Sequence, residues 1–228
     1  MARKGNKRHI KALNAPKYFG VHRKESKYVA KPSPGRHSKQ KSIALLVLLK
    51  KAGLVDSSSE AVRAVKTHKI AVNGKTVSNP KYAVGLNDMI AIEGLGKSYA
   101  VSISSKGQAA LEEAKEGDAS RKCKVVGKYV WKSNSVMLRL HDGTVLKAPD
   151  KKIKVGDTIV LDQSRKPVSH IPLGVGSKCL VIDGVHVGHS GKVVSLTKGN
   201  MHVNALATVE EEDGNKFDTI VNNIIVVG

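Results

Sequence analysis

The stretch SIALLVLLKKAGLVDSSSEAVRAVKTHKIAVNGKTV, residues 42–77, decides the fold, because it holds two helix patterns and a hairpin pattern in close succession. Its first part, residues 43–49, is apolar on every side and is followed by two lysines and then Gly53. Cations in the last turn and a glycine after it are typical of a helix C-terminus. We therefore expect a buried helix over residues 43–49, with Ser42 as its N-terminal cap.

A second helix is predicted to begin at Ser57, because Glu60 follows it at the capping-box spacing. Helical spacing gives this helix an apolar inner face and a cationic outer face. The inner face consists of Ala61, Val62 and Val65. The outer face carries Arg63 and Lys66, and it is the first candidate surface for an anionic partner.

A hairpin follows directly, because residues 70–72 and 75–77 are β-formers on either side of Asn73-Gly74. An Asn-Gly pair is the usual sequence of a type I′ turn. Further strand patterns occupy residues 89–92 and 99–103. The unit thus consists of a helix, a helix and a hairpin, with strands that close it.

The rest of the chain shows mainly β patterns after a hydrophilic helix candidate over residues 106–115. A small all-β module is predicted from strands at 124–130, 136–140, 144–147 and 158–161, with a turn at Asp142-Gly143. A third module begins near Gly174, with strands at 178–182, 191–196, 203–209 and 217–221 and a turn at Asp213-Gly214.

The chain carries 39 Lys and Arg against 19 Asp and Glu, a net charge of +20 over 228 residues. Such an excess predicts an anionic partner, and a phosphate polymer is favoured because each cation placed on a phosphate releases counterions. Residues 1–41 hold thirteen basic residues and one acidic residue, whereas residues 174–228 hold four basic and six acidic residues. Aromatic residues are scarce, so base stacking should not dominate over shape and phosphate recognition.

Residues 1–41 lack periodicity and are interrupted by Pro and Gly, so alone they bury too little apolar surface to offset the entropy of ordering. We expect an extended basic arm that orders only on a partner, with residues 31–37 as a stiff strap. Its expected phosphate contacts are Arg3, Lys4, Lys7, Arg8, Lys11, Lys17, Arg23, Lys24, Lys27, Lys31, Arg36, Lys39 and Lys41.

The longest apolar stretch, residues 43–49, is far shorter than the roughly 20 residues of a membrane-spanning helix. The basic N-terminus has no apolar block of the kind found in secretory signals. Cys123 and Cys179 lie far apart and form no Cys-x-x-Cys pair, so they indicate neither a zinc site nor a disulfide framework. We expect a cytoplasmic protein with two buried cysteines, no membrane partner, no metal and no cofactor.

Three short patterns could suggest an enzyme or a metal site, and each has a simpler explanation. Residues 96–98 resemble part of a nucleotide-binding loop, but Ala91 stands where that loop needs a glycine. Asp142 follows Arg-Leu-His, so an extra His disrupts the Arg-Leu-Asp of pseudouridine synthases. His186 and His189 have no third ligand at a suitable spacing. We expect no catalytic residue and no small-molecule substrate.

The ordered series over residues 43–105 resembles the RNA-binding module named after bacterial ribosomal protein four. In that family the second helix and the hairpin lie against structured RNA. The resemblance implies phosphate contacts from Lys51, Arg63, Lys66, Lys69 and Lys75.

Residues 181–194 look like a KOW motif, a strand, glycine-bearing loop and strand found in ribosomal and transcription-elongation proteins. The candidate loop contacts are Gly188, His189, Gly191 and Lys192. Both glycines are expected to take positive φ and to bring backbone N–H groups to a phosphate or a partner. His189 stands where relatives often have Arg, which weakens the expected cationic contact.

Residues 9–17, 32–37, 153–159 and 215–228 are together similar to the archaeal and eukaryotic small-subunit ribosomal protein four family, over essentially the whole chain. The departures are Tyr18-Phe19, where relatives often have a Trp, and Arg36, which replaces a proline. The resemblance implies a structural constituent of the cytoplasmic small ribosomal subunit. Its expected partners are small-subunit rRNA and neighbouring ribosomal proteins, without a homo-oligomer.

The expected fold is therefore α+β and multi-module, with four parts. They are a basic rRNA-binding arm over residues 1–41, the helix-helix-hairpin RNA-binding module over 42–105, a central β module over 106–173, and a KOW-containing SH3-like β-barrel over 174–228. Two other functions remain open, a free RNA chaperone or translation factor and a KOW-type transcription-associated interaction protein. The second of these would place the chemistry in residues 174–228, which are net acidic.

Overall fold

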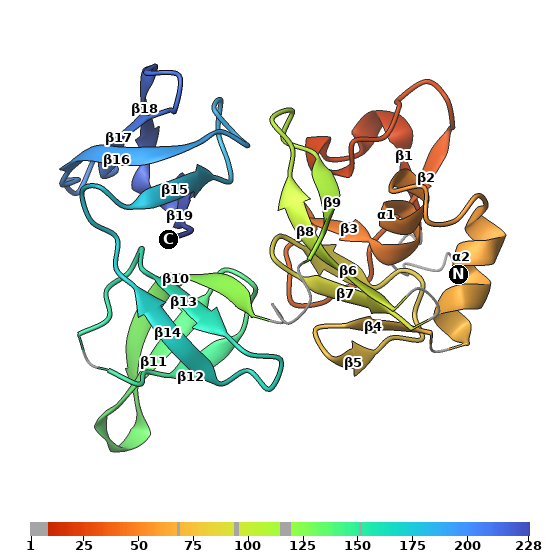
Figure 1. The fold of residues 1–228 in the computed structure, drawn as a ribbon, viewed down its shortest axis with the longest axis horizontal. Coiled ribbons are helices and arrows are strands. Elements are labelled where there is room, and N and C mark those ends of the chain that lie inside the picture. Colours follow the sequence, from red (N-terminus) through yellow and green to blue (C-terminus); the bar gives the residue numbers. More distant parts are fainter. Residues whose placement is uncertain (1–8, 68, 94–95, 115–119, 151) are drawn as a thin grey trace, which may run out of the picture. The chain divides into compact units, whose positions relative to one another are not determined.

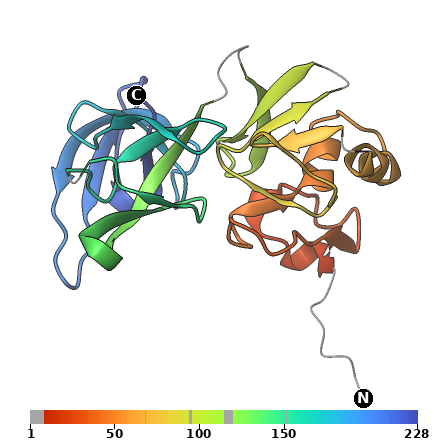
Figure 2. The same ribbon diagram turned by 90° about the horizontal axis from the view of Figure 1, so that it is seen from below.

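The computed structural model describes residues 9–67, 69–93, 96–114, 120–150 and 152–228. The chain divides into two compact units (Figure 1; Figure 2). The N-terminal unit is Met1–Ser102 with Gln108–Glu116, and the C-terminal unit is Ile103–Gly107 with Gly117–Gly228. Among the described residues, no helix has the length and apolar character needed to cross a membrane.

The N-terminal unit combines the two helices with a five-stranded antiparallel sheet in the order β5-β4-β7-β8-β9. The helices are α1 Leu45–Lys51 and α2 Ser58–Lys66. The sheet strands are β4 Ile70–Val72, β5 Lys75–Thr76, β7 Met89–Ile92, β8 Lys97–Ile103 and β9 Ala109–Glu113. Two small ladders complete the unit, β1 His9–Lys11 with β2 Tyr28–Ala30, and β3 Ser42–Ala44 with β6 Ala83–Gly85.

The first helix begins later than predicted, and the expected cap at Ser42 is wrong. Ser42–Ala44 is a strand paired with β6, and helix α1 begins at Leu45 without a side-chain cap. The backbone N–H groups of Leu45 and Leu46 instead donate to the carbonyls of Tyr82 and Pro80, at 2.9 and 3.0 Å. Carbonyls from a distant loop therefore satisfy donors that a capping side chain would otherwise bind.

The helix predicted over residues 106–115 is also wrong, because this segment contains the edge strand β9. The Lys51 ammonium donates to the carbonyl of Ala109 at 2.8 Å, and Ala109 itself is fully buried. At the end of the strand, the N–H of Ala114 donates to Ser98 at 2.9 Å. Tertiary pairing thus overrides a sequence composition that favours helix.

Residues 9–41 differ from the expected extended arm, because they fold within the N-terminal unit. The 3-10 turns Ala12–Asn14 and Lys17–Phe19 lie between β1 and β2, and Phe19 is completely buried. In the strap, the N–H of Ser33 donates to the carbonyl of Lys81 at 2.7 Å, and His37 is buried. Local apolar anchors therefore give this segment a packed structure, while residues 1–8 lie outside the described residues.

The C-terminal unit contains two five-stranded antiparallel sheets, in the orders β12-β11-β10-β13-β14 and β18-β17-β16-β15-β19. The first consists of β10 Arg121–Trp131, β11 Ser135–Leu140, β12 Val145–Lys147, β13 Thr158–Leu161 and β14 Pro167–Ile171. The second consists of β15 Lys178–Val181, β16 Ser190–Thr197, β17 Leu206–Glu210, β18 Lys216–Ile220 and β19 Ile224–Val226. Strands β14 and β19 were not predicted. In the part of the chain that the structure describes, no hydrogen-bonded ladder joins the outermost strands β18 and β19 of the second sheet.

Lys124 joins the two sheets of this unit through a buried side chain. Its ammonium donates to the carbonyls of Val221 and Ile224, at 2.7 and 2.6 Å. Nearby, the N–H of Val226 donates to the Thr158 hydroxyl at 3.1 Å. Each sheet has its own apolar cluster, and these polar contacts connect them.

Candidate nucleic-acid interface

The cationic helix α2 is built as the sequence predicts. The Ser57 hydroxyl accepts the N–H of Glu60 at 3.1 Å, and the Glu60 carboxylate accepts the N–H of Asp56 at 3.0 Å. The face toward the unit is apolar, with Ala61 and Val65 fully buried. The opposite face exposes two cations, Arg63 and Lys66.

The hairpin that follows α2 is also confirmed. Asn73 and Gly74 have φ of 52° and 73°, as a type I′ turn requires. The turn exposes Lys75, while the Asn73 side chain points back into the unit. Its amide donates to Asp88 at 2.7 Å, and its oxygen accepts the N–H of Met89 at 3.0 Å. The exposed turn is therefore fixed to the sheet behind it.

Asp88 connects this hairpin to the strap of the N-terminal arm. Its carboxylate lies 2.8 Å from His37 Nε2 and 3.5 Å from the guanidinium of Arg36, and it accepts the N–H of Gly85 at 3.0 Å. Burial alone would raise the pKa of Asp88, but hydrogen bonds and the His37 ring hold it below its ordinary value. A Cβ at Gly85 would lie 2.3 Å from the His37 ring, so only glycine leaves room for it. Sequence reasoning missed this pair.

Most of the predicted phosphate contacts are exposed. The exposed ones are Lys11, Lys17, Arg23, Lys24, Lys27, Lys39, Lys41, Lys51, Arg63, Lys66, Lys69 and Lys75. Lys31 and Arg36 are half-buried. Arg3, Lys4, Lys7 and Arg8 lie outside the described residues. The structure places two of these cations on α2 and Lys75 on β5, with Lys69 and strand β4 between them in the chain.

Lys51 and Arg36 differ from the other predicted contacts, because contacts within the fold already engage them. The Lys51 ammonium binds the carbonyl of Ala109, and its partial burial lowers its pKa. The Arg36 guanidinium faces Asp88. Both contacts stabilise the fold of the N-terminal unit. A contact between an external phosphate and Lys51 or Arg36 remains a prediction.

The loop between β15 and β16 is arranged differently from the prediction. Gly188 has φ of +85°, as expected, but its N–H donates to the carbonyl of Val181 at 2.8 Å. Gly191 does not have positive φ and lies inside β16, where a Cβ would be 2.4 Å from the carbonyl oxygen of Glu210. The expectation of positive φ at Gly191 is therefore wrong; the residue is needed for close strand approach. His189 Nδ1 lies 2.5 Å from the Glu211 carboxylate.

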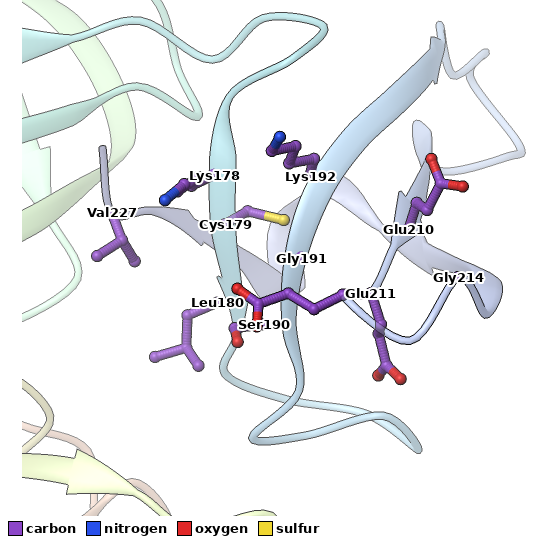
Figure 3. Close-up of a pocket in the computed structure, with 11 residues that line it drawn as sticks. Lys178, Cys179, Leu180, Ser190, Gly191, Lys192, Glu210, Glu211, Gly214 and Val227 are labelled. Atoms are coloured by element: carbon purple, nitrogen blue, oxygen red, sulfur yellow. The ribbon is translucent and has the colours of Figure 1, made fainter.

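A cleft of about 670 Å³ lies beside this loop, on the sheet of the C-terminal unit (Figure 3). Its walls carry both charges, with Lys178 and Lys192 on β15 and β16 and three consecutive glutamates from residue 210 on β17 and the turn after it. Cys179 also lines it, and burial raises the pKa of its thiol to about 11. The thiol therefore stays protonated at neutral pH and is a weak nucleophile.

The enzyme-like patterns have structural explanations. Asp142 is buried, lies 3.0 Å from the guanidinium of Arg121, and accepts both the N–H and the hydroxyl of Thr144 at 2.9 and 2.6 Å. Residues 97–103 form strand β8, so no helix N-terminus follows Gly96 to bind a phosphate. His186 stacks on Phe217, with ring centroids 4.3 Å apart. Among the described residues, no group of three or more His, Cys, Asp or Glu could hold a metal ion.

Three family models match the chain in sequence order. An RS4NT (NUC023) domain matches residues 4–40, an S4 domain matches residues 45–90, and the ribosomal family S4e matches residues 95–167. Together these matches cover the arm, the helix-helix-hairpin module and the central β module.

Curated relatives match over the full length. The small ribosomal subunit protein eS4 of Methanocaldococcus jannaschii is 32% identical over 238 residues, which covers 100% of this chain and 97% of the relative. That of Staphylothermus marinus is 34% identical over 239 residues, covering 100% and 95%. The crystal structure of the 30S ribosomal protein S4e from Thermoplasma acidophilum is 30% identical, with a TM-score of 0.71 over 82% of this chain and 95% of that one.

Proposed function

The chain belongs to the eS4 family of small ribosomal subunit proteins, and on that premise we propose that it stabilises folded small-subunit rRNA through contacts with phosphates. It is a structural ribosomal protein and not an enzyme, and its S4 domain binds RNA. It works in the small subunit of the cytoplasmic ribosome.

The observation that carries the proposal is the exposed cationic path from α2 into the hairpin. Arg63 and Lys66 project from a helix whose other face is fixed in the core, and Lys75 projects from a turn held by Asn73 and Asp88. Cations on a rigid support lose little entropy when they bind, so they fit the fixed phosphates of a folded RNA. The net charge of +20 supplies long-range attraction to the same partner.

The N-terminal arm is proposed as a second phosphate-binding region. Lys17, Arg23, Lys24 and Lys39 are exposed on a segment that Phe19 and His37 anchor to the unit. These cations therefore project from a segment that is packed within the N-terminal unit. The boundaries 1–41, 42–105, 106–173 and 174–228 remain our proposal. The family matches over residues 4–40 and 45–90 support the first two modules, and the match over residues 95–167 spans most of the third.

The C-terminal sheet is proposed to be an SH3-like β-barrel fold of the KOW class, on the basis of the motif over residues 181–194 and its five consecutive antiparallel strands. Glu210, Glu211 and Glu212 form an acidic wall of its cleft, opposite Lys178 and Lys192, and this wall disfavours RNA phosphates. We propose that a neighbouring ribosomal protein with a basic segment contacts this wall. Crosslinks from the cleft to protein support this, and crosslinks mainly to rRNA would contradict it.

The experiment that tests the main proposal compares two double charge reversals in the full chain. Arg63→Glu with Lys66→Glu alters the α2 face, and Lys166→Glu with Lys198→Glu makes the same change in net charge at exposed sites elsewhere. The α2 variant should lose at least about tenfold in affinity for small-subunit rRNA, with a smaller loss for the control. Equal losses in both variants would show that only the total charge matters and would refute a localised α2 surface.

A further inference from the structure

A bulge in β10 turns two aromatic side chains to solvent. Before the bulge, Val125 pairs with Leu140 and both are buried in the core. The register shifts between Val125 and Gly127, which moves the following odd-numbered residues to the opposite face. Tyr129 and Trp131 therefore project to the outer face and are 40% and 57% exposed, and Val130 on the other face is 63% exposed, so this end of β10 is open on both faces.

The strand pairing extends this outer face over β11 and β12. Tyr129 pairs with Met137, which pairs with Lys147, so the three form one row across the sheet. The next row is Gly127, Arg139 and Val145. Because directly paired residues project to the same side of a sheet, aromatic, apolar and cationic groups lie together on this outer face. The hairpin can be followed from the labels β10, β11 and β12 in Figure 1.

The two rings lie close together and are both exposed. Tyr129 and Trp131 meet edge to face, with centroids 6.4 Å apart and an angle of 78° between the rings. Gly127 contributes no side chain, and the Arg139 guanidinium lies 3.5 Å from the position that a Cβ there would occupy. The planar cation therefore lies over the backbone two residues before Tyr129, on the same face.

The charge of this hairpin identifies the class of partner. Over residues 121–147 there are seven basic residues and one acidic residue, Asp142. Asp142 is buried against Arg121, so the exposed charges, including Lys132, Arg139 and Lys147, are positive. This surface combines exposed aromatic rings with exposed charges that are all positive. It therefore fits a single-stranded nucleic acid, whose bases can stack on the rings and whose phosphates are anionic. A duplex offers no free base faces to such a sheet.

We propose that the outer face of β10, β11 and β12 binds unpaired RNA nucleotides, with bases stacked on Tyr129 and Trp131 and phosphates near Arg139 and Lys147. The inference rests on the proposed rRNA binding and adds to it a second surface with a different kind of contact. The α2 face would bind the backbone of folded RNA, whereas this face would bind exposed bases in a loop or at an end.

Trp131 provides a direct test, because it is the only tryptophan in the chain. A single-stranded oligoadenylate is titrated into the full chain, and Trp131 fluorescence is followed together with anisotropy of a label on the RNA. Stacking of adenine on the indole should quench the emission in step with binding. Heparin, a polyanion without bases, should bind without comparable quenching.

Variants separate stacking from charge. Tyr129→Ala should weaken oligoadenylate binding by about 5- to 100-fold, because one base–aromatic stack is removed, and Tyr129→Phe should restore it. Met201→Ala removes an exposed apolar side chain from a loop of the C-terminal unit and should have no effect. The Arg63→Glu, Lys66→Glu variant should still bind the oligoadenylate, although its binding of folded rRNA is weakened.

Several results would overturn the inference. They are RNA binding without a change in Trp131 emission, equal quenching by heparin, and a Tyr129→Ala variant that binds as the unaltered chain does. Any of these together with normal binding of folded rRNA would refute the stacking face and leave the α2 proposal intact. The proposed function itself would be refuted if the full chain bound folded rRNA only weakly and the charge reversals at Arg63 and Lys66 did not change that affinity.

Discussion

His37 Nε2 lies 2.8 Å from the Oδ2 atom of Asp88, and both side chains are almost fully buried. The two residues are 51 positions apart, so this contact fixes the N-terminal strap to the loop before β7. The same carboxylate holds the Asn73 amide at the hairpin. One buried acid therefore positions two of the segments to which we assign phosphate contacts.

Removal of His37 should destabilise the N-terminal unit. His37→Ala removes the imidazole partner of the buried Asp88 carboxylate, which costs about 3 kcal/mol of unfolding free energy. Chemical denaturation of the full chain, followed in the transition of this unit, measures the loss. Ser38→Ala, at the exposed neighbouring position, is the control and should change stability by less than about 0.5 kcal/mol. A His37→Ala variant as stable as this control would contradict the role of the pair.

Asp88 should make stability depend on acid pH in a defined direction. Because its pKa is lowered in the folded state, its contribution is fully present above its ordinary value of 3.8 and is lost as the pH falls through the lowered value. The unfolding free energy of the unaltered chain should therefore fall in this acid range. Asp88→Asn should be less stable at neutral pH and should show a smaller fall. Parallel curves for the two chains would refute the assignment.

The local patterns predicted α2 and the hairpin correctly, because their determinants are close in sequence. Ser57 and Glu60 are three residues apart, and Asn73-Gly74 defines its own turn. The start of α1 was mispredicted because its first N–H groups bind carbonyls of Tyr82 and Pro80. Such partners, more than thirty residues away, leave no local signal.

In the candidate site, too, features set by nearby residues were predicted and features set by distant contacts were not. Exposure of Arg63, Lys66 and Lys75 follows from helical and hairpin periodicity. The outward direction of the Tyr129 side chain does not follow from strand periodicity, because the bulge in β10 reverses which residues face the core. A glycine inside a strand, here Gly127, is the one signal in the sequence that could have indicated the bulge.

Gly188 should be sensitive to any side chain. Gly188→Ala would place Cβ 2.4 Å from the backbone oxygen of Ser104, in addition to the cost of positive φ. Gly214→Ala shares positive φ, but no atom lies within 4 Å of its Cβ position, so it measures the conformational cost alone. We expect Gly188→Ala to lower the melting temperature more than Gly214→Ala does. Equal shifts would show that the close approach to Ser104 is not important.

Lys124 should stabilise the connection between the two sheets of the C-terminal unit. Lys124→Met keeps the apolar stem but removes the donor to Val221 and Ile224, which should cost about 2 to 3 kcal/mol. Lys122→Met removes an exposed hydrogen bond to the carbonyl of Val227 and should cost less. Denaturation curves of both variants test the order, and a larger loss for Lys122→Met would contradict it.

The measurement that tests the central claim most directly is the affinity of the full chain for small-subunit rRNA as a function of salt concentration. If cations bind phosphates, each bound phosphate releases counterions, and the affinity should fall by at least about a hundredfold between 50 and 200 mM salt. The slope should be shallower for the Arg63→Glu, Lys66→Glu variant, by about one for each phosphate that the variant no longer binds. An affinity that does not change over this range would contradict the account.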